Sequence, residues 1–129
     1  MAATTDRSAI RREAERRGRR AETVAVWLLR LKGYRLLARR YKTPVGEIDL
    51  IVRRGQTIAF VEVKSRPTMA EASEAATPAG RRRIARAASF WLARNPEAAT
   101  LSLRFDVIVL ASGHWPRHLV GVFDADGAA

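Results

Sequence analysis

Two short segments of alternating apolar and polar residues place the strongest constraint on what this chain can fold into. Residues 47–53 (EIDLIVR) and 57–64 (TIAFVEVK) each alternate with a period of two, which is typical of β-strands with one buried face. Arg54-Gly55 lies between them and predicts a two-residue hairpin turn. We therefore expect an antiparallel hairpin whose two faces differ in chemistry.

This hairpin gathers acidic side chains. Matching the apolar faces of the two strands sets Ile48 opposite Val61. The same register sets Glu47 opposite Glu62 and leaves Asp49 diagonal to Glu62, with Cβ separations of roughly 5 Å and 7–8 Å. Like charges that face one another destabilise a sheet unless another group compensates them.

A divalent cation would compensate this charge. The chain has no Cys and 2 His, so oxygen coordination of Mg²⁺ or Mn²⁺ is favoured over a zinc site. Lys64 shares a strand face with Glu62, where it could orient or deprotonate a water, or neutralise charge on a phosphate. Acid-x-Lys triplets are also common as solvated surface pairs worth under about 1 kcal/mol. The hairpin alone leaves both interpretations open.

The whole sequence predicts one α/β domain. A helical pattern ends at Gly33, a suitable C-cap, and residues 65–78 are expected to be mostly loop. The domain spans residues 1–129, with a core over about 8–123 and frayed ends at 1–7 and from Asp124. The α-β-β-β-α-β-β order indicates a mixed central sheet flanked by helices. The expected elements are a helix at 8–32, strands at 34–41, 47–53 and 57–64, a helix at 79–94, and strands at 101–110 and 119–123.

Several side chains are assigned to the core or to structural roles. Trp27 and Trp91 lie on or near apolar stripes and are expected to be buried. Asp106 lies in an apolar strand and is expected to bond backbone or an arginine. His114 and His118 are expected to be loop residues, because no third nitrogen or sulfur ligand accompanies them. The apolar stripe of the first helix comprises Ala21, Val24, Ala25, Leu28 and Leu31.

The charge of the chain favours a polyanionic partner. Its 24 Lys and Arg against 13 Asp and Glu give a net charge of +11, which indicates nucleic acid first and an acidic membrane surface second. An Arg-rich helix is also an ordinary solvated face, so this alternative stays open. The candidates for phosphate contact are the Arg-rich first helix together with Arg39, Arg40, Lys42, Arg66, Arg81, Arg82 and Arg83.

Other classes of protein are excluded or disfavoured. The absence of Cys removes disulfide scaffolds, iron–sulfur clusters and thiol catalysis. No apolar run approaches the roughly 18–20 residues that span a bilayer, and the basic N-terminal region lacks the apolar stretch of a signal peptide. No Walker A loop, GxGxxG or nucleophile elbow is present. We therefore expect a cytoplasmic protein without membrane association.

Five motifs resemble those of a known family. They are GRRAE at 18–22, GYRLLARRY at 33–41, VGEIDLIV at 45–52, FVEVKSR at 60–66 and LRFDVIVL at 103–110. In order and spacing they resemble the YraN-like family of uncharacterised bacterial proteins, over about residues 18–123. That family is similar to the PD-(D/E)xK nuclease superfamily and to archaeal Holliday-junction resolvases. The resemblance implies a restriction-endonuclease-like core with a metal-dependent phosphodiesterase site.

Carried over residue by residue, the resemblance implies a site made of Glu22, Asp49, Glu62 and Lys64. Asp49 and Glu62 would hold Mg²⁺ or Mn²⁺, Glu22 would complete the ligand shell directly or through water, and Lys64 would position the attacking water. On a helical wheel alone, Glu22 lies at the edge of the apolar stripe, where a glutamate is more often solvated or ion-paired. Family members often have Asn at the position of Arg40.

The leading hypothesis is a metal-dependent, structure-selective DNA endonuclease that acts on branched or structured DNA. Cleavage of a symmetric junction would require two sites and hence a homodimer. The alternative is a non-catalytic nucleic-acid-binding protein that retains the nuclease fold, and a third possibility is an interaction protein whose partner supplies specificity.

Overall fold

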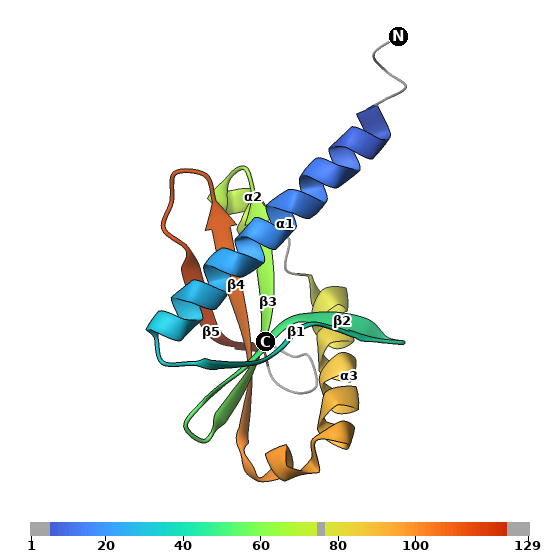
Figure 1. Ribbon diagram of the computed structural model, residues 1–129, viewed down its shortest axis with the longest axis vertical. Coiled ribbons are helices and arrows are strands. Elements are labelled where there is room, and N and C mark those ends of the chain that lie inside the picture. The colour runs from blue at the N-terminus through green and yellow to red at the C-terminus, as the bar shows by residue number, and fades with distance from the viewer. Residues whose placement is uncertain (1–5, 75–76, 124–129) are drawn as a thin grey trace.

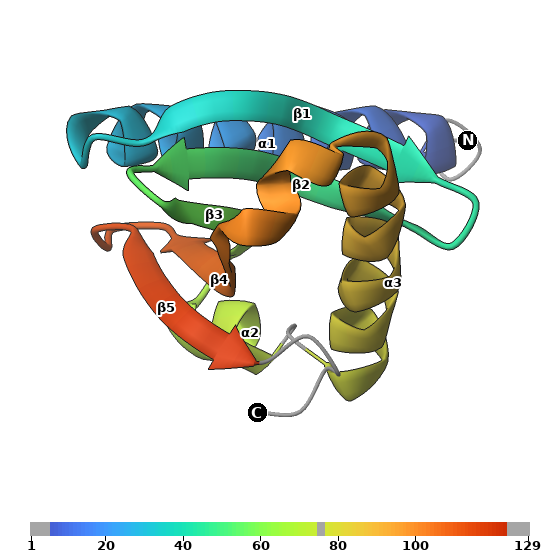
Figure 2. The same cartoon turned by 90° about the horizontal axis from the view of Figure 1, so that it is seen from below.

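A mixed sheet lies between two helices in the computed structural model, which describes residues 6–74 and 77–123. Helix α1 crosses one face of the sheet, and α3 covers the other (Figures 1 and 2). No helix within these two ranges is long and apolar enough to cross a membrane. The elements in chain order are α1 (Asp6–Leu31), β1 (Arg35–Thr43), β2 (Gly46–Arg54), β3 (Thr57–Arg66), α2 (Met69–Glu74), α3 (Pro78–Arg94), the 3-10 turn η2 (Pro96–Thr100), β4 (Ser102–Ala111) and β5 (Arg117–Phe123).

The five strands are ordered β1-β2-β3-β4-β5. Only the β3–β4 pair is parallel, and the other three neighbouring pairs are antiparallel. A parallel pair needs a long crossover, which α2, α3 and η2 supply. The predicted α/β class with a mixed sheet is confirmed, and every predicted helix and strand is present close to its expected bounds.

Two departures concern the chain ends and the segment 65–78. Residues 6 and 7, which were expected to fray, belong to α1, whereas 1–5 and 124–129 lie outside the described residues. The expected loop contains helix α2. Thr68 Oγ1 accepts a hydrogen bond of 3.2 Å from Glu71 N, so the T-x-x-E sequence that begins at Thr68 caps this helix.

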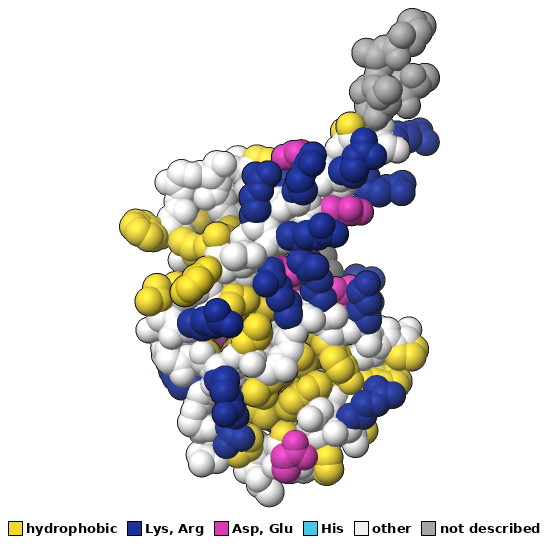
Figure 3. Space-filling model, viewed as in Figure 1, with side chains coloured by type: hydrophobic (Ala, Val, Ile, Leu, Met, Phe, Trp, Pro, Cys, Tyr) yellow, Lys and Arg dark blue, Asp and Glu magenta, His cyan; other side chains and the backbone are white. Residues whose placement is uncertain are grey.

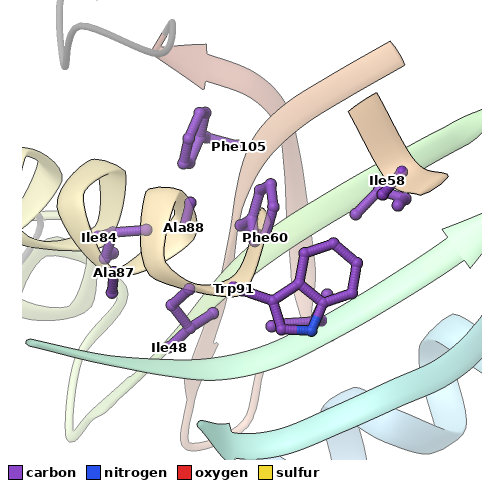
Figure 4. Packing of buried hydrophobic residues seen from close by; sticks show 10 residues of the cluster. Ile48, Ile58, Phe60, Ile84, Ala87, Ala88, Trp91 and Phe105 are labelled. Atoms are coloured by element: carbon purple, nitrogen blue, oxygen red, sulfur yellow. The ribbon is translucent and has the colours of Figure 1, made fainter. Parts of the chain in front are cut away.

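Each long helix buries a separate set of side chains against the sheet. On the α1 side, Leu29 packs with Leu50 and Val61. On the α3 side, Trp91 meets the ring of Phe60 edge-on, with 5.8 Å between ring centroids, in the cluster shown in Figure 4. Complete burial of side chains of this size contributes about 1.5–3 kcal/mol each. The two clusters therefore fix α1 and α3 on opposite faces.

The stripe of α1 that faces the sheet is rotated from the predicted one. Val24, Trp27 and Leu31 are 43%, 60% and 84% exposed, so their predicted burial is wrong, whereas the predicted burial of Trp91 is confirmed. Both stripes have helical spacing, and a sheet on one side of a helix can cover only one of them. The α1 residues buried against the sheet are Ala21, Ala25, Val26 and Leu29.

The turn of the β2–β3 hairpin is displaced by one residue. It consists of Gly55 and Gln56, because Arg54 pairs with Thr57, and not of Arg54 and Gly55 as predicted. Gly55 has φ +59 at the first turn position, as in type II′ turns, where glycine has no steric cost. The turn therefore forms where a glycine can occupy the position that needs a positive φ.

The displaced turn shifts β3 by two residues relative to β2. Leu50 pairs with Val61, so the apolar faces still match, as the period of two requires. Pairing ends there, so Asp49 and Glu62 are the residues next to the last pair on their strands. The predicted pairing of Glu47 with Glu62 is wrong, because Leu50 and not Ile48 lies opposite Val61.

Asp106 is fully buried in β4, and both its carboxylate oxygens are hydrogen-bonded. Arg104 donates from Nε at 2.9 Å and from Nη2 at 2.8 Å, and Gly121 N donates at 3.1 Å. His118 Nε2 lies 2.7 Å from Asp106 Oδ2, and Lys32 Nζ lies 2.8 Å from His118 Nδ1. An ammonium group only donates, so Nδ1 accepts and Nε2 carries the proton that bonds Asp106.

This network confirms the structural role of Asp106 and corrects the placement of His118, which lies in β5 with a buried side chain. Burial raises the pKa of Asp106, but the hydrogen bonds from His118 and Arg104 outweigh this effect and hold the pKa below its ordinary value. The network joins β4 and β5 to the end of α1, which Lys32 follows.

Replacing Asp106 with Asn should destabilise the protein by about 3 kcal/mol at pH 7, because Arg104 loses its buried counter-charge. The folded pKa lies below the unfolded one, so the carboxylate stabilises the wild type above about pH 4, and this contribution is lost as the pH falls through the folded pKa. Urea unfolding at pH 7 and pH 3 measures both effects. Glu15→Gln, at an exposed acid of α1, is the control. A loss at pH 7 no larger than that of the control would contradict this role.

Candidate active site

The β2–β3 hairpin opens into a fork beyond Leu50 and Val61. Pairing between the two strands ends at these residues, whereas β2 continues along β1 and β3 continues along β4. Asp49 is the first residue of β2 inside the fork, and its Oδ2 accepts a hydrogen bond of 2.8 Å from Val63 N. Where the strands separate, Val63 N has no carbonyl of β2 opposite it. The carboxylate of Asp49 takes the place of that carbonyl as the hydrogen-bond acceptor.

Strand β1 is irregular at the same level. The β1–β2 register places Arg40 opposite Asp49. Arg40 has φ +51, a left-handed conformation that is uncommon for arginine and that Asn adopts more readily. The alternation of β2 is also broken here, because Ile48 packs in the α3 cluster while Leu50 packs in the α1 cluster. Irregular backbone of this kind concentrates at functional sites.

Helix α1 supplies the third wall of the site. Glu22 is on its inner side, and Arg40 Nε donates to Glu22 Oε1 at 2.7 Å, with Arg39 Nε 3.5 Å from the same oxygen. Glu22 and Asp49 line one cavity of about 420 Å³. Figure 3 shows the surface hollowed beneath the projecting end of α1, with basic side chains around it. The remaining lining residues are Ala14, Arg17, Gly18, Ala21, Val63, Ser65 and Arg66.

Glu62 and Lys64 form an ion pair beside the fork. Lys64 Nζ lies 2.6 Å from Glu62 Oε1, and the two side chains are 23% and 12% exposed respectively. Both charges act on Asp49, so the two residues lie close enough to work with it. Glu47 is exposed on β2, opposite Lys42 of β1, and does not belong to this group.

The cavity raises the pKa of Asp49 to about 6 from an ordinary value of 3.8. Burial is the largest cause, and the negative charges of Glu22 and Glu62 raise the pKa further. The hydrogen bond from Val63 N and the charge of Lys64 act in the opposite direction and are outweighed. Asp49 is therefore a carboxylate whose charge is poorly compensated in the protein alone.

The residues fit a hard divalent cation by donor type. Glu22, Asp49 and Glu62 supply carboxylate oxygens, which Mg²⁺ and Mn²⁺ prefer, and the poorly compensated Asp49 would gain from a bound cation. Within residues 6–74 and 77–123, no three acidic or histidine side chains converge closely enough to hold an ion. The reason is visible in the pairing: Glu22 bonds Arg40, and Glu62 bonds Lys64.

The basic residues named from the sequence divide into two groups. Arg39 and Arg40 bond Glu22, and Arg66 lines the cavity. Lys42 is exposed on β1. Arg81, Arg82 and Arg83 lie in the first turns of α3, the helix that covers the opposite face from α1 (Figure 2), so they do not line this cavity.

The structure thus brings together the four predicted site residues, from α1, β2 and β3. It adds Arg17, which lines the cavity one residue before Gly18. Arg17 is one of several arginines in α1, and its position in that run gives no sequence signal that separates it from the others.

Comparison with known proteins identifies close relatives. The profile described as "Uncharacterised protein family UPF0102" matches residues 21–110. A protein named UPF0102 protein from Chelativorans sp. (strain BNC1) is 52% identical over 115 residues, which cover 89% of this chain and 93% of the relative. One from Parvibaculum lavamentivorans is 58% identical over 106 residues, covering 82% and 80%. One from Methylorubrum extorquens is 51% identical over 127 residues, covering 98% and 99%.

Replacing Asp49 with Asn should stabilise the protein by about 2–3 kcal/mol at pH 8, at about 1.4 kcal/mol for each unit of pKa shift. The folded chain keeps the Asp49 proton up to about pH 6, and the unfolded chain releases it near 3.8. Wild-type stability should therefore fall as the pH rises between these values, and the variant should lack this fall.

Urea unfolding at pH 4 and pH 8 tests this expectation. Glu47→Gln changes an exposed acid two residues away on the same strand and should leave the pH dependence intact. Equal stability of wild type and Asp49→Asn at pH 8 would show that the Asp49 charge is not strained by its surroundings.

Proposed function

The chain belongs to the uncharacterised protein family UPF0102, the YraN-like family that its motifs resemble, and we propose that it is a metal-dependent DNA endonuclease. The observation that supports this proposal is the fork between β2 and β3. There Glu22 and Asp49 line one cavity, and the ion pair of Glu62 and Lys64 lies beside it, close enough for both charges to act on Asp49. The protein as a whole is strongly basic.

The chemistry of these residues suits hydrolysis of a phosphodiester. Asp49, Glu62 and Glu22 would hold Mg²⁺ or Mn²⁺, which would neutralise phosphate charge and lower the pKa of a water. Lys64, which forms an ion pair with Glu62 in the protein alone, would orient the attacking water and stabilise charge that develops on the phosphate. The water would give up one proton as its oxygen forms a bond to phosphorus. One phosphorus–ester oxygen bond would break, and the leaving oxygen would take up one proton, which gives a phosphomonoester and an alcohol.

Two of the acidic side chains are already in ion pairs, and these pairs would have to break when a cation and substrate bind. Arg40 and Lys64 now act as counter-charges for Glu22 and Glu62. A cation that replaces them would free both basic groups to contact phosphate oxygens. This replacement of counter-charges would be easiest if DNA and cation bind together, because a phosphate would then neutralise the charge of Arg40 when the cation takes its place beside Glu22. The α/β sheet would be a restriction-endonuclease-like core, and the enzyme would act in the cytoplasm on branched or structured DNA.

A second candidate is a non-catalytic nucleic-acid-binding protein with the same fold. It is favoured by one observation, which is that the three acids of the predicted site are already paired with Arg40, Lys64 and the amide of Val63. Such a protein would bind DNA through phosphate contacts alone, with strong salt dependence and no need for a divalent cation.

Cleavage of labelled linear and four-way branched DNA in about 5 mM Mg²⁺ or Mn²⁺ distinguishes the two candidates. We expect cleavage by the wild type and at least about 100-fold slower cleavage by Asp49→Asn and Lys64→Gln, with DNA affinity changed by less than about 5-fold. Glu47→Gln, which alters an exposed acid on the same strand, should cleave like the wild type.

A metal-binding measurement completes this test. Mg²⁺ should raise the thermal midpoint of the wild type more at pH 8 than at pH 5, because the ion binds ionised Asp49. Asp49→Asn should lose this shift. DNA binding without cleavage in either metal, and without a metal-dependent midpoint, would reject the endonuclease and favour the binding protein.

A further inference from the structure

The inner face of α1 extends beyond the sheet. Ala21 and Ala25 are buried against the strands, and the same face continues toward the N-terminus through Gly18 and Ala14, spaced by three or four residues. Ala14 is exposed and Gly18 is partly exposed. Figure 1 shows that this part of α1 projects past the ends of the strands. Gly18 and Ala14 therefore form the roof of the cavity, over Asp49 and Val63.

Gly18 has no structural reason to be glycine. A Cβ atom built there meets no other atom within 4 Å, and its φ is not in the left-handed range. Glycine in the middle of a helix is destabilising relative to alanine, because the unfolded chain loses more freedom on folding. An alanine would fit the folded protein and strengthen α1. The one thing that glycine supplies here is open space on the roof of the cavity, one turn before Glu22.

We propose that a phosphodiester strand passes beneath α1 at Gly18, with its backbone against the bare helix surface. Close approach of a ligand to the main chain is a recognised use of glycine. This inference rests on the proposed function, since it assigns the substrate strand a path through the same cavity. It adds a binding surface on α1 that is separate from the four acidic and basic residues of the fork.

The surroundings of Gly18 fit this ligand. Arg17 and Arg66 line the cavity from α1 and from the end of β3, and guanidinium groups bind phosphate oxygens in pairs of parallel hydrogen bonds. The cavity of about 420 Å³ is in the range of sites for small ligands, which suits one nucleotide unit of a strand and excludes the full width of a duplex. The strand in the cavity would come from an unpaired region of the DNA. Alternatively, it would be the strand of a duplex that lies nearer to α1, with the other strand outside the cavity.

Gly18→Leu and Ala9→Leu form a matched pair that tests the path. Leucine at 18 fills the roof, whereas leucine at 9 lies on an exposed part of the same helix away from the cavity. Binding of one fluorescent oligonucleotide is measured as a single strand and as a duplex, in Ca²⁺ and low salt. We expect at least a 10-fold loss of affinity for Gly18→Leu and less than a 2-fold change for Ala9→Leu.

Gly18→Ala separates stability from binding. It should raise the thermal midpoint by about 2–4 °C and weaken DNA binding by about 3-fold, a combination that a merely structural glycine would not give. A loss confined to the single strand identifies an unpaired strand as the ligand, and an equal loss on both forms identifies a strand within a duplex. Both results support the proposal.

The outcomes distinguish this inference from the proposed function. If Gly18→Leu binds and cleaves DNA like the wild type while Asp49→Asn does not cleave, the path beneath α1 is rejected and the endonuclease stands. If the wild type binds DNA and Gly18→Leu does not, but no cleavage occurs in any metal, the path stands and catalysis is rejected. If the wild type does not bind DNA, both are rejected.

Discussion

The candidate site depends on one hydrogen bond, from Val63 N to the carboxylate of Asp49. Where β2 and β3 separate, an amide of β3 needs an acceptor that the neighbouring strand no longer provides, and a side chain of β2 supplies it. This bond joins the two strands across the fork and fixes the carboxylate of Asp49 between them. The cavity beneath α1 exists because the strands part at this level, so the geometry of the site follows from an amide that must be satisfied.

Two aspartates in this protein show how partners decide the pKa of a buried carboxyl. Burial raises the pKa of both, but Asp106 is bonded by Arg104 and His118, and its pKa falls below the ordinary value. Asp49 accepts one amide hydrogen bond and faces two further acids, the charge of Lys64 does not outweigh its burial, and its pKa rises to about 6. The first arrangement stabilises the fold. The second costs the fold stability and leaves a negative charge available to a ligand.

Much of this arrangement could be predicted from the sequence, because the period of two in β2 and β3 fixes which residues share a face. The register could not, since a shift by two keeps the faces matched, and the position of Gly55 in the turn decides between the alternatives. The T-x-x-E sequence that caps α2 is a recognisable helix start, but the prolines on both sides of this segment favoured a loop. The left-handed backbone of Arg40 has no signature in a run of basic residues, and the helical wheel offered two apolar stripes for α1.

Three features of this molecule reduce its stability. Two of them line the same cavity, and the third lies in a residue that bonds Glu22 of its lining. Asp49 is desolvated beside other acids, Arg40 has a left-handed backbone, and Gly18 weakens the middle of α1 without a packing reason. By contrast, α2 and α3 have side-chain caps at their N-termini, and the buried Asp106 is fully bonded. Where local rules fail together in one place, a requirement other than folding is the economical explanation. We therefore assign the charge of Asp49, the backbone of Arg40 and the open space at Gly18 to the proposed ligand site, since no single contact within the protein accounts for all three.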